Sequence, residues 1–392
     1  MAGDSLAHTD LGYRVSEAAA TSGGSTAINK LWLPVWSGEV IHAYDEVNQF
    51  ENLVTHKTIP SGRKMEFPIT GTVNLKSAWS AGEELVGQEG SSSTSTTFAV
   101  ELDKRPMAAH FELDNVDLMI TQWEYRAELA RQAGMTLANA RDRQLFAYII
   151  RAAAEGQRTD DPRGTFTSGL DATCFSDTDF QHLGNTGSSA SNRTEAALKL
   201  LQGIEDFVVH LQLNNCDTEG IYCCVGVQAF QDIRALGVAR VIADDPGNGQ
   251  PMFGGVAAAG GLGAPFTQGL NNLGDTLTYM GVTIMKSNHM LTANDPTNVG
   301  EARYSLKYAD AGVKACIWQA GAVASLRLQG LKVDTVDDIR RNTTFTVASM
   351  MGGTGVIAPE KAGFFSSIGA GADTRSEVRT LLGGNFSTEY GA

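Results

Sequence analysis

Apolar residues recur at helical spacing, three or four positions apart, in several stretches of the chain. The longest stretch, 124–154, contains no proline and consists mostly of strong helix formers. One face of this predicted helix is formed by Tyr125, Leu129, Ala133, Leu137 and Ala140. At ~1.5 Å per residue the helix would be roughly 46 Å long, with Gly134 as its weak point. Shorter helices are predicted over 37–53, 194–213 and 228–236.

Alternation of apolar and polar residues predicts two strands within 64–102. Met65, Phe67 and Ile69 alternate in the first strand, and later Phe98, Val100 and Leu102 alternate in the second. The long polar stretch between them predicts a projecting hairpin. Because an isolated hairpin is marginal in water and its open edges can pair, we expect its partner on a neighbouring subunit. Further strands are predicted over 107–113, 221–225, 282–286, 313–319, 325–333 and 343–350.

Three segments lack the periodicity of a packed element. Residues 1–30 are rich in Ala, Gly, Ser and Thr and are expected to form a mobile arm. Residues 243–275 are glycine-rich and are expected to form loops, and 367–392 are a weakly patterned tail with helical spacing over 375–382. The pattern as a whole predicts a mixed α+β chain with two flexible ends and a projecting arm.

The formal net charge of −14 narrows the range of functions. An acidic chain repels phosphate, which disfavours tight nucleic-acid binding through a basic surface but is compatible with enclosing DNA. The five cysteines have no paired spacing and the first ten residues carry no signal segment, which favours free thiols in a reducing cytoplasm. No run approaches the ~20 apolar residues that a membrane helix needs.

No motif predicts a catalytic, cofactor or metal site. Cys223-Cys224 with Cys216 and His210 does not match zinc-ligand spacing, and a buried strand is the favoured interpretation of the adjacent cysteines. The glycine runs near 247 and 260 match neither phosphate-loop pattern, and Asp244-Asp245 lacks the further ligands of a calcium loop. None of the seven histidines lies in a catalytic sequence motif. A Ser-His-Asp triad is assembled from residues that meet only in the folded protein, so sequence spacing alone does not exclude one. We predict that the chain is not an enzyme.

Short motifs along the chain resemble, in the same order, those of major capsid proteins from short-tailed double-stranded DNA phages of the coliphage T-seven type. Ser37-Gly-Glu-Val is similar to the family's GGEV helix, and Ile59-Pro-Ser-Gly-Arg-Lys-Met-Glu-Phe-Pro is similar to its SGK…FP strand. Ala81-Gly-Glu-Glu-Leu resembles the PGE loop. The remaining motifs are Phe111–Asp114 with Gln122-Trp-Glu-Tyr-Arg-Ala-Glu-Leu, Tyr279-Met-Gly-Val-Thr-Ile, Ala322-Val-Ala-Ser-Leu-Arg-Leu and Val356-Ile-Ala-Pro-Glu-Lys-Ala-Gly-Phe-Phe. Each motif is short, so the resemblance rests on their collinear order over 31–365.

The resemblance implies an α+β chain with the tailed-phage major capsid protein fold of the Hong Kong phage type. Such a fold has an N-arm, an extended β-hairpin loop, a long spine helix, and peripheral and axial domains. The expected ranges are 1–58 for the N-terminal arm with its short helix, 59–113 for the extended loop, 114–193 for the spine helix and first peripheral part, 194–305 for the axial domain, 306–353 for the peripheral strands, and 354–392 for the axial return strand and C-terminal tail. Relatives often carry Arg-Pro where this chain has Ala358-Pro359, and no Lys–Asn crosslink pair is predicted.

The implied function is self-assembly, as pentamers and hexamers, into the icosahedral shell that encloses the phage genome in the virion. The implied partners are further copies of the chain, a scaffolding protein during assembly in the host cytoplasm and a portal protein at one vertex. A decoration protein is an optional further partner, and the sequence leaves its presence open. Packaged DNA would be enclosed without sequence-specific binding, and no membrane or cofactor takes part. The residues predicted for inter-subunit contacts are Phe67, Ile69, Trp79, Phe98, Val100, Asp337, Arg340 and Arg341.

Two rival interpretations stay open at this point. An encapsulin-like compartment shares the fold and would carry enzyme cargo. An α+β hydrolase would be a monomer or small oligomer with catalytic turnover. That interpretation leaves the long unpaired hairpin unexplained.

Overall fold

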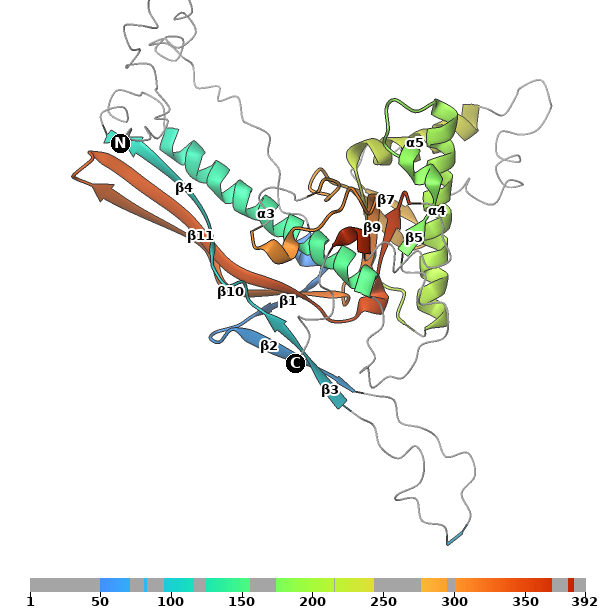
Figure 1. Cartoon of the computed structure of the whole chain (residues 1–392), viewed down its shortest axis with the longest axis horizontal. Helices are drawn as coiled ribbons and strands as arrows, with labels where there is room; N and C mark the ends of the chain where they lie inside the picture. Colours follow the sequence, from blue (N-terminus) through green and yellow to red (C-terminus); the bar gives the residue numbers. More distant parts are fainter. Residues whose placement is uncertain are drawn as a thin grey trace, which may run out of the picture. The chain divides into compact units, whose positions relative to one another are not determined.

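The computed structural model describes residues 50–70, 81–82, 95–115, 125–155, 174–214, 216–242, 276–294, 300–368 and 380–383. These residues form two compact units (Figure 1), which are described separately below. The smaller unit comprises 105–115, 125–139 and 329–351, and the larger unit comprises the other described residues. In the described part of the chain no helix is both long and apolar enough to cross a membrane.

The larger unit is built on a six-stranded sheet with the order β5-β12-β9-β6-β8-β7. Its central strands β9 (Val313–Gln319) and β6 (Ile221–Val225) are antiparallel, and β6 runs parallel to β8 (Val282–Lys286). Strand β12 (Ala362–Ser366) returns from the end of the chain and pairs with β9. Both edges are short strands, β5 (Cys174–Ser176) and β7 (Thr276–Tyr279). Long-range pairing therefore joins segments that lie far apart in the sequence.

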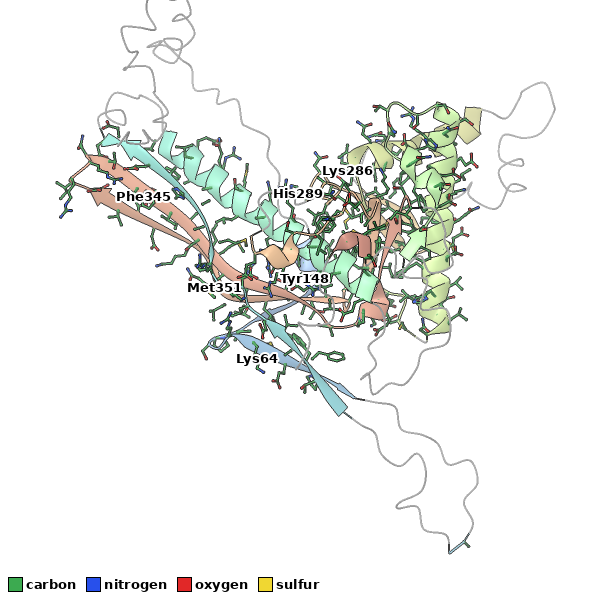
Figure 2. All side chains as sticks on the ribbon, viewed as in Figure 1. Lys64, Tyr148, Lys286, His289, Phe345 and Met351 are labelled. Atoms are coloured by element: carbon green, nitrogen blue, oxygen red, sulfur yellow. The ribbon has the colours of Figure 1, made fainter. Side chains whose placement is uncertain are left out.

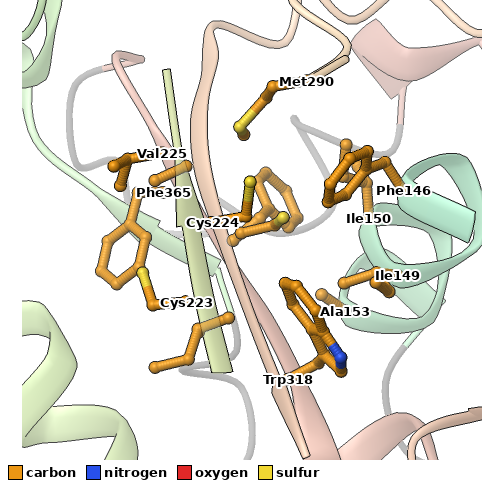
Figure 3. Packing of buried hydrophobic residues seen from close by; sticks show 14 of the residues in the cluster. Phe146, Ile149, Ile150, Ala153, Cys223, Cys224, Val225, Met290, Trp318 and Phe365 are labelled. Atoms are coloured by element: carbon orange, nitrogen blue, oxygen red, sulfur yellow. The ribbon is translucent and has the colours of Figure 1, made fainter. Parts of the chain in front are cut away.

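Helices cover both faces of this sheet. The second half of α3 (Tyr125–Glu155) packs on one face, where the ring centroids of Phe146 and Trp318 lie 6.1 Å apart. Helix α4 (Ala190–Leu213) packs on the other face so closely that a Cβ at Gly203 would lie 2.5 Å from Phe365. Figure 3 shows Cys223 and Phe365 on one side of β6, and Cys224 on the side of Phe146 and Trp318. Residues 144–154 of α3 are all buried, which is the burial expected of a helix that lies within the body of the unit.

The adjacent cysteines confirm the interpretation of a buried strand. Cys223 and Cys224 both have 0% of their surface exposed, and burial raises the pKa of each thiol above its usual value. Cys224 lies directly opposite Cys316 in the β6–β9 pair. Among the residues that the structure describes, no group of three or more His, Cys, Asp and Glu side chains is arranged to hold a metal ion.

Local signals explain where α4 and its neighbours begin. Ser189 is the N-cap of α4, and its hydroxyl accepts a hydrogen bond from Asn192 N at 3.2 Å. Lys199 of α4 pairs with Asp177 at 2.9 Å and with Asp179, at the start of η4 (Thr178–His182). Partial burial acts in the opposite direction, but the Asp179 backbone N–H and the Lys199 ammonium lower the pKa of Asp177. Helix α5 (Val227–Ile242) follows β6 directly.

The larger unit also contains the β2–β3 hairpin and the first part of a four-stranded sheet with the order β1-β10-β11-β4. Strand β1 (Thr55–Thr58) runs parallel to the start of β10 (Val323–Asp338), with Thr55 opposite Ala324 and Thr58 opposite Arg327. Strands β2 (Lys64–Thr70) and β3 (Ser95–Glu101) form a separate antiparallel pair. The predicted hairpin strands are therefore confirmed, while its tip lies outside the described residues.

The smaller unit is a three-stranded sheet with the first half of α3 on one face. It comprises β4 (Met107–Asp114), β10 from Gln329 onward and β11 (Thr343–Val356) as far as Met351. Ala133 and Leu137 of α3 pack against Ala348 and Met350 of β11. These helical residues lie on the predicted apolar face, which the structure thus confirms at Ala133 and Leu137.

Gly134 of α3 is a site where substitution should stabilise the chain. A Cβ added there would lie 3.8 Å from Leu331 Cδ2, an ordinary van der Waals contact. Because alanine is the better helix former, we expect Gly134→Ala to raise the free energy of unfolding by about 1 kcal/mol, measured by urea unfolding. Ala138→Gly, on the same helix, should lower it by a similar amount. An unchanged unfolding midpoint in both variants would contradict this account of α3.

Several predicted elements differ from the observed ones. The helix over 37–53 and the loops over 243–275 lie outside the described residues, apart from a short 3₁₀ helix, η2 (Glu51–Leu53). Strands β1, β5 and β7 were not predicted, because they are only three or four residues long and gain their conformation from pairing with longer strands. Strand β9 falls in the range predicted for peripheral strands and is hydrogen-bonded to β6 and β12. The domain ranges stay predictions.

Candidate assembly site

The root of the β2–β3 hairpin packs into the body of the larger unit. Val100 and Leu102 have 1% and 2% of their surface exposed and form a small core with Ile59, Ala324 and Leu326. Met65 and Phe67 pack against the same core from β2. Leu102 N donates to Arg63 O at 2.8 Å, which closes the base of the hairpin. One face of the hairpin root is thereby attached to its own subunit.

Glycines in β11 allow this root to approach the sheet backbone. A Cβ at Gly353 would lie 2.7 Å from Leu102 Cα and closer still to Glu101 O, and a Cβ at Gly355 would lie 2.5 Å from Val100 Cγ1. Asp103 N donates to Gly352 O at 3.0 Å. Any side chain at these positions would push the hairpin root away, so the run Gly352-Gly353-Thr354-Gly355 determines how the hairpin is seated.

A buried arginine of α3 joins the strands around the hairpin root. Arg141 has 1% of its surface exposed, and its guanidinium donates to Gly353 O at 2.7 Å and to Ser325 Oγ at 2.9 Å. Its other terminal nitrogen donates to Gln144 Oε1 at 2.8 Å. The planar fork of arginine suits this role because its donors have fixed directions. One side chain thus joins α3, β10 and β11.

The network continues to the segment that leaves the hairpin. Gln144 Nε2 lies 3.3 Å from Asp103 Oδ2, and Asp103 is 2% exposed. The Tyr304 hydroxyl donates to Asp103 Oδ1 at 2.7 Å, and Arg303 forms an ion pair with the same carboxylate. Burial and the Asp103 carboxylate raise the pKa of Tyr304, so its phenol stays a neutral donor. A buried carboxylate is tolerated here because it is paired and hydrogen-bonded.

A second charged cluster lies where the described chain begins. Glu51 of η2 forms an ion pair with Arg327 of β10, and Ser325 Oγ lies 3.4 Å from Glu51 Oε1. His56 Nδ1 lies 3.7 Å from the same carboxylate. Partial burial lowers the pKa of His56, Glu51 raises it, and Arg327 and Arg141 lower it further, with a net decrease. His56 is therefore a neutral side chain near neutral pH.

The lowered pKa of His56 predicts a pH-dependent stability. The unfolded chain, with a histidine pKa near 6.5, binds the proton more readily than the folded chain. The stability gained from keeping His56 neutral is therefore fully present above pH 6.5. It is lost as the pH falls from 6.5 toward the lower pKa of His56 in the folded chain. We expect the urea midpoint of the unassembled chain to decrease between pH 7.5 and pH 5, and His56→Gln to flatten that decrease. Equal slopes in both proteins would contradict the assignment.

The β10–β11 tongue, defined as residues 329–351, carries the predicted charged contact residues. Asp337 accepts a hydrogen bond from Thr344 Oγ1 at 2.8 Å, Arg340 N donates to Asp338 Oδ1 at 2.9 Å, and Arg341 lies 3.9 Å from Glu112. All three predicted residues are exposed. The tongue also exposes apolar side chains, among them Phe345 of β11 in Figure 2. The exposed apolar residues of the tongue are Leu331, Val333, Val336, Ile339 and Phe345.

The hairpin residues predicted to contact a neighbouring subunit differ in how much of their surface is exposed. Phe67 is half-buried beside the small core and keeps surface that a neighbour could cover. Phe98 and Val100 are only 5% and 1% exposed within their own chain, which leaves little of their surface for a neighbour to cover. The inter-subunit role predicted for them stays a prediction. Trp79 and the side chain of Ile69 lie outside the described residues.

Sequence reasoning missed Arg141, Asp103 and the glycine run of β11. A signal was present, because Arg141 follows Leu137 by four positions and Gln144 follows Arg141 by three on the predicted apolar face of the long helix. Polar residues on such a face indicate a buried polar network. Three glycines within four residues of a strand likewise indicate close approach of another backbone.

No family model and no curated protein matches the chain, but its fold is similar to those of solved phage capsid structures. The capsid structure of Cyanophage P-SCSP1u is 22% identical with a TM-score of 0.65, covering 91% of this chain and 99% of that one. The mature capsid of bacteriophage PhiM1 is 13% identical with a TM-score of 0.62, covering 85% and 91%. The matched chain of Mycobacterium phage Che8 is 15% identical with a TM-score of 0.52, covering 86% and 97%. The fold predicted from the sequence motifs is thereby confirmed.

Proposed function

We propose that this chain, which has the tailed-phage capsid fold of the Hong Kong phage type, is a major capsid protein. It self-assembles as pentamers and hexamers into the icosahedral shell that encloses the genome of a double-stranded DNA bacteriophage. The observation that carries the proposal is the similarity to capsid chains over nearly their whole length, 99% of one and 91% of another. No separate catalytic domain is needed to account for the described residues.

The geometry supports a structural function. A shell needs a stiff body and projecting segments that reach neighbours. The three-layer body and the continuous helix α3 supply stiffness, while the β2–β3 hairpin and the tongue supply extended surfaces. The hairpin root is held by the β11 glycines and by Arg141, so force on the hairpin is transmitted to the body of the subunit. The acidic chain encloses DNA without binding it tightly.

The finer assignments are part of the same proposal. The collinear motifs favour a short-tailed phage of the coliphage T-seven type. The proposed partners are further copies of the chain, a scaffolding protein during assembly in the host cytoplasm and a portal protein at one vertex, with a decoration protein as an optional addition. The proposed location is the virion capsid, and the proposed role involves no enzymatic turnover.

The proposal is tested by expressing the chain with and without its scaffolding partner. Negative-stain electron microscopy and sedimentation velocity should show closed shells of uniform diameter. Monomers or dimers under both conditions would contradict the proposal. Shells that contain co-purifying enzyme cargo, and form without a scaffold or portal, would instead indicate an encapsulin-like compartment.

Deleting 79–95 from the hairpin should weaken the shell without unfolding the subunit. The deletion removes the predicted hairpin tip and leaves Val100 and Leu102 in the subunit core. We expect fewer closed shells and a lower temperature of shell disruption, measured by microscopy after heating. The far-UV circular dichroism of the unassembled chain should keep its helical signal. Normal shells with unchanged heat resistance would exclude an assembly role for the hairpin.

A further inference from the structure

Two cysteines face each other at the centre of the six-stranded sheet. Cys224 of β6 lies directly opposite Cys316 of β9 in the antiparallel pair of these strands. Directly opposite residues project from the same face of a sheet, with Cα atoms about 4.5 or 5.5 Å apart. Both separations lie within the range of roughly 4.4–6.8 Å that a disulfide spans. The backbone register therefore brings these two side chains to bridging distance.

Burial keeps this pair of thiols unreactive while the sheet is covered. Cys224 and Cys316 are free thiols, and each has 0% of its surface exposed. Burial, followed by a hydrogen bond between the two thiols, raises the pKa of Cys224 well above its usual value. Because the thiolate is the reactive form and an oxidant must reach it, the pair reacts only when the layers over the sheet open locally.

The register also separates this pair from the other cysteines. Figure 3 shows Cys223 on the opposite side of β6 from Cys224. Cys174 of β5 has the same register position as Cys316, but β12 lies between their strands, which places the two about 9.6 Å apart. That separation exceeds the roughly 7 Å beyond which no bridge forms without backbone movement. Cys216 precedes β6 and lies outside the sheet.

A bridge at this position would join the two central strands of the sheet covalently. It would close a long loop of the chain, 224–316, and a closed loop reduces the conformational freedom of the unfolded chain. Cβ atoms of directly opposite residues are about 4.5–5.5 Å apart, slightly more than a relaxed disulfide spans. The strands must therefore approach each other to close the bond, which makes the bond more easily reduced than a relaxed one.

We propose that Cys224 and Cys316 form a reversible cross-strand disulfide when the chain meets a small-molecule disulfide such as oxidised glutathione. One cysteine, as its thiolate, attacks the glutathione disulfide, forms a mixed disulfide and releases one glutathione thiol. The second cysteine attacks the protein sulfur of that mixed disulfide and releases the second glutathione thiol. The pair thus loses two electrons and two protons, and one oxidised glutathione becomes two reduced ones. The inference does not depend on the proposed function, because both strands belong to one chain.

Peptide mapping of the oxidised chain tests the proposal. The reduced Cys223→Ala chain is incubated with oxidised glutathione at a urea concentration below its unfolding midpoint, where local opening is more frequent. Remaining thiols are blocked, and the chain is cut with trypsin and a glutamate-specific protease. The expected product joins peptide 220–234, which holds Cys224, to peptide 315–327, which holds Cys316. We expect this pair to account for most of the protein disulfide that mass spectrometry detects.

Three results of this mapping would overturn the proposal: both thiols still free, glutathione attached to either one without a bridge, or bridges spread among the cysteines. Fragmentation between the two adjacent cysteines of the wild-type peptide gives the same assignment without any substitution.

The stability of the oxidised chain provides a second test. Oxidation should raise the urea midpoint of the Cys223→Ala chain by roughly 0.5 M or more, and a reducing agent added in urea should reverse the shift. Cys316→Ala, treated in the same way, should show no shift on oxidation. An equal shift in both variants would overturn the proposed bridge, because the effect would then come from another cysteine. If Cys316→Ala does not fold, the peptide map alone decides.

Discussion

Replacing Gly353 with alanine should lower the free energy of unfolding by about 1–3 kcal/mol and reduce the yield of closed shells. The new Cβ would lie 2.7 Å from Leu102 Cα and closer to Glu101 O, and both are backbone atoms that cannot rotate away. The hairpin root must therefore shift away from β11, which also disturbs Asp103 N and its bond to Gly352 O. Urea unfolding measures the first effect and electron microscopy the second.

Gly330→Ala is the matched control for this prediction. Gly330 also lies in a strand of the same sheet, but a Cβ added there meets nothing within 4 Å. We expect a change in unfolding free energy within about 0.5 kcal/mol for this variant. If both alanine variants were equally stable, the close approach of the hairpin root to β11 would not be a determinant of stability.

The elements that were predictable from sequence are those whose pattern is local. The long helix was predicted over 124–154 and is observed at Tyr125–Glu155, because proline-free helix formers with one apolar face specify a helix without tertiary information. Strands β6, β8 and β9 have their predicted bounds, since each is a short, mostly apolar run suited to a buried sheet.

The elements that were missed depend on pairing across the chain. Strand β1 has the sequence Thr-His-Lys-Thr, which is polar, and it becomes a strand because it lies beside β10. β10 extends beyond its predicted end at Val333 through Asp334, Asp337 and Asp338, residues that disfavour strands in isolation. Pairing with β11 overrides that local preference.

The candidate assembly site likewise has features that local sequence predicts and features that depend on residues far away in the chain. Alternation identified the hairpin and the residues that seat it, including Val100, but not whether each side chain faces its own subunit or a neighbour. That distinction depends on Ala324 and Leu326, which are more than two hundred positions away in the chain. The partners of Arg141 are also remote in sequence, with Ser325 184 positions and Gly353 212 positions away, so its role could be suspected from the helix pattern but its network could not be derived.

Replacing Arg141 with methionine should destabilise the subunit by about 3–5 kcal/mol. Methionine fills similar volume but donates no hydrogen bond, so Gly353 O, Ser325 Oγ and Gln144 Oε1 each lose a buried donor. Arg141→Lys should recover only part of this loss, because a single ammonium cannot reproduce the directions of the guanidinium fork. Urea unfolding of the unassembled chain provides the measurement.

Arg131→Met on the same helix separates the buried network from the loss of any arginine. Arg131 is one-third exposed and pairs with Glu128 at 2.9 Å within the helix, so its replacement should cost less than about 1 kcal/mol. A large difference between the two variants would locate the stabilising effect at the contacts of Arg141 with β10 and β11. Similar small losses would mean that the hairpin root is held by apolar packing and by the β11 glycines. In that case Gly353→Ala should affect shell yield far more than Arg141→Met does.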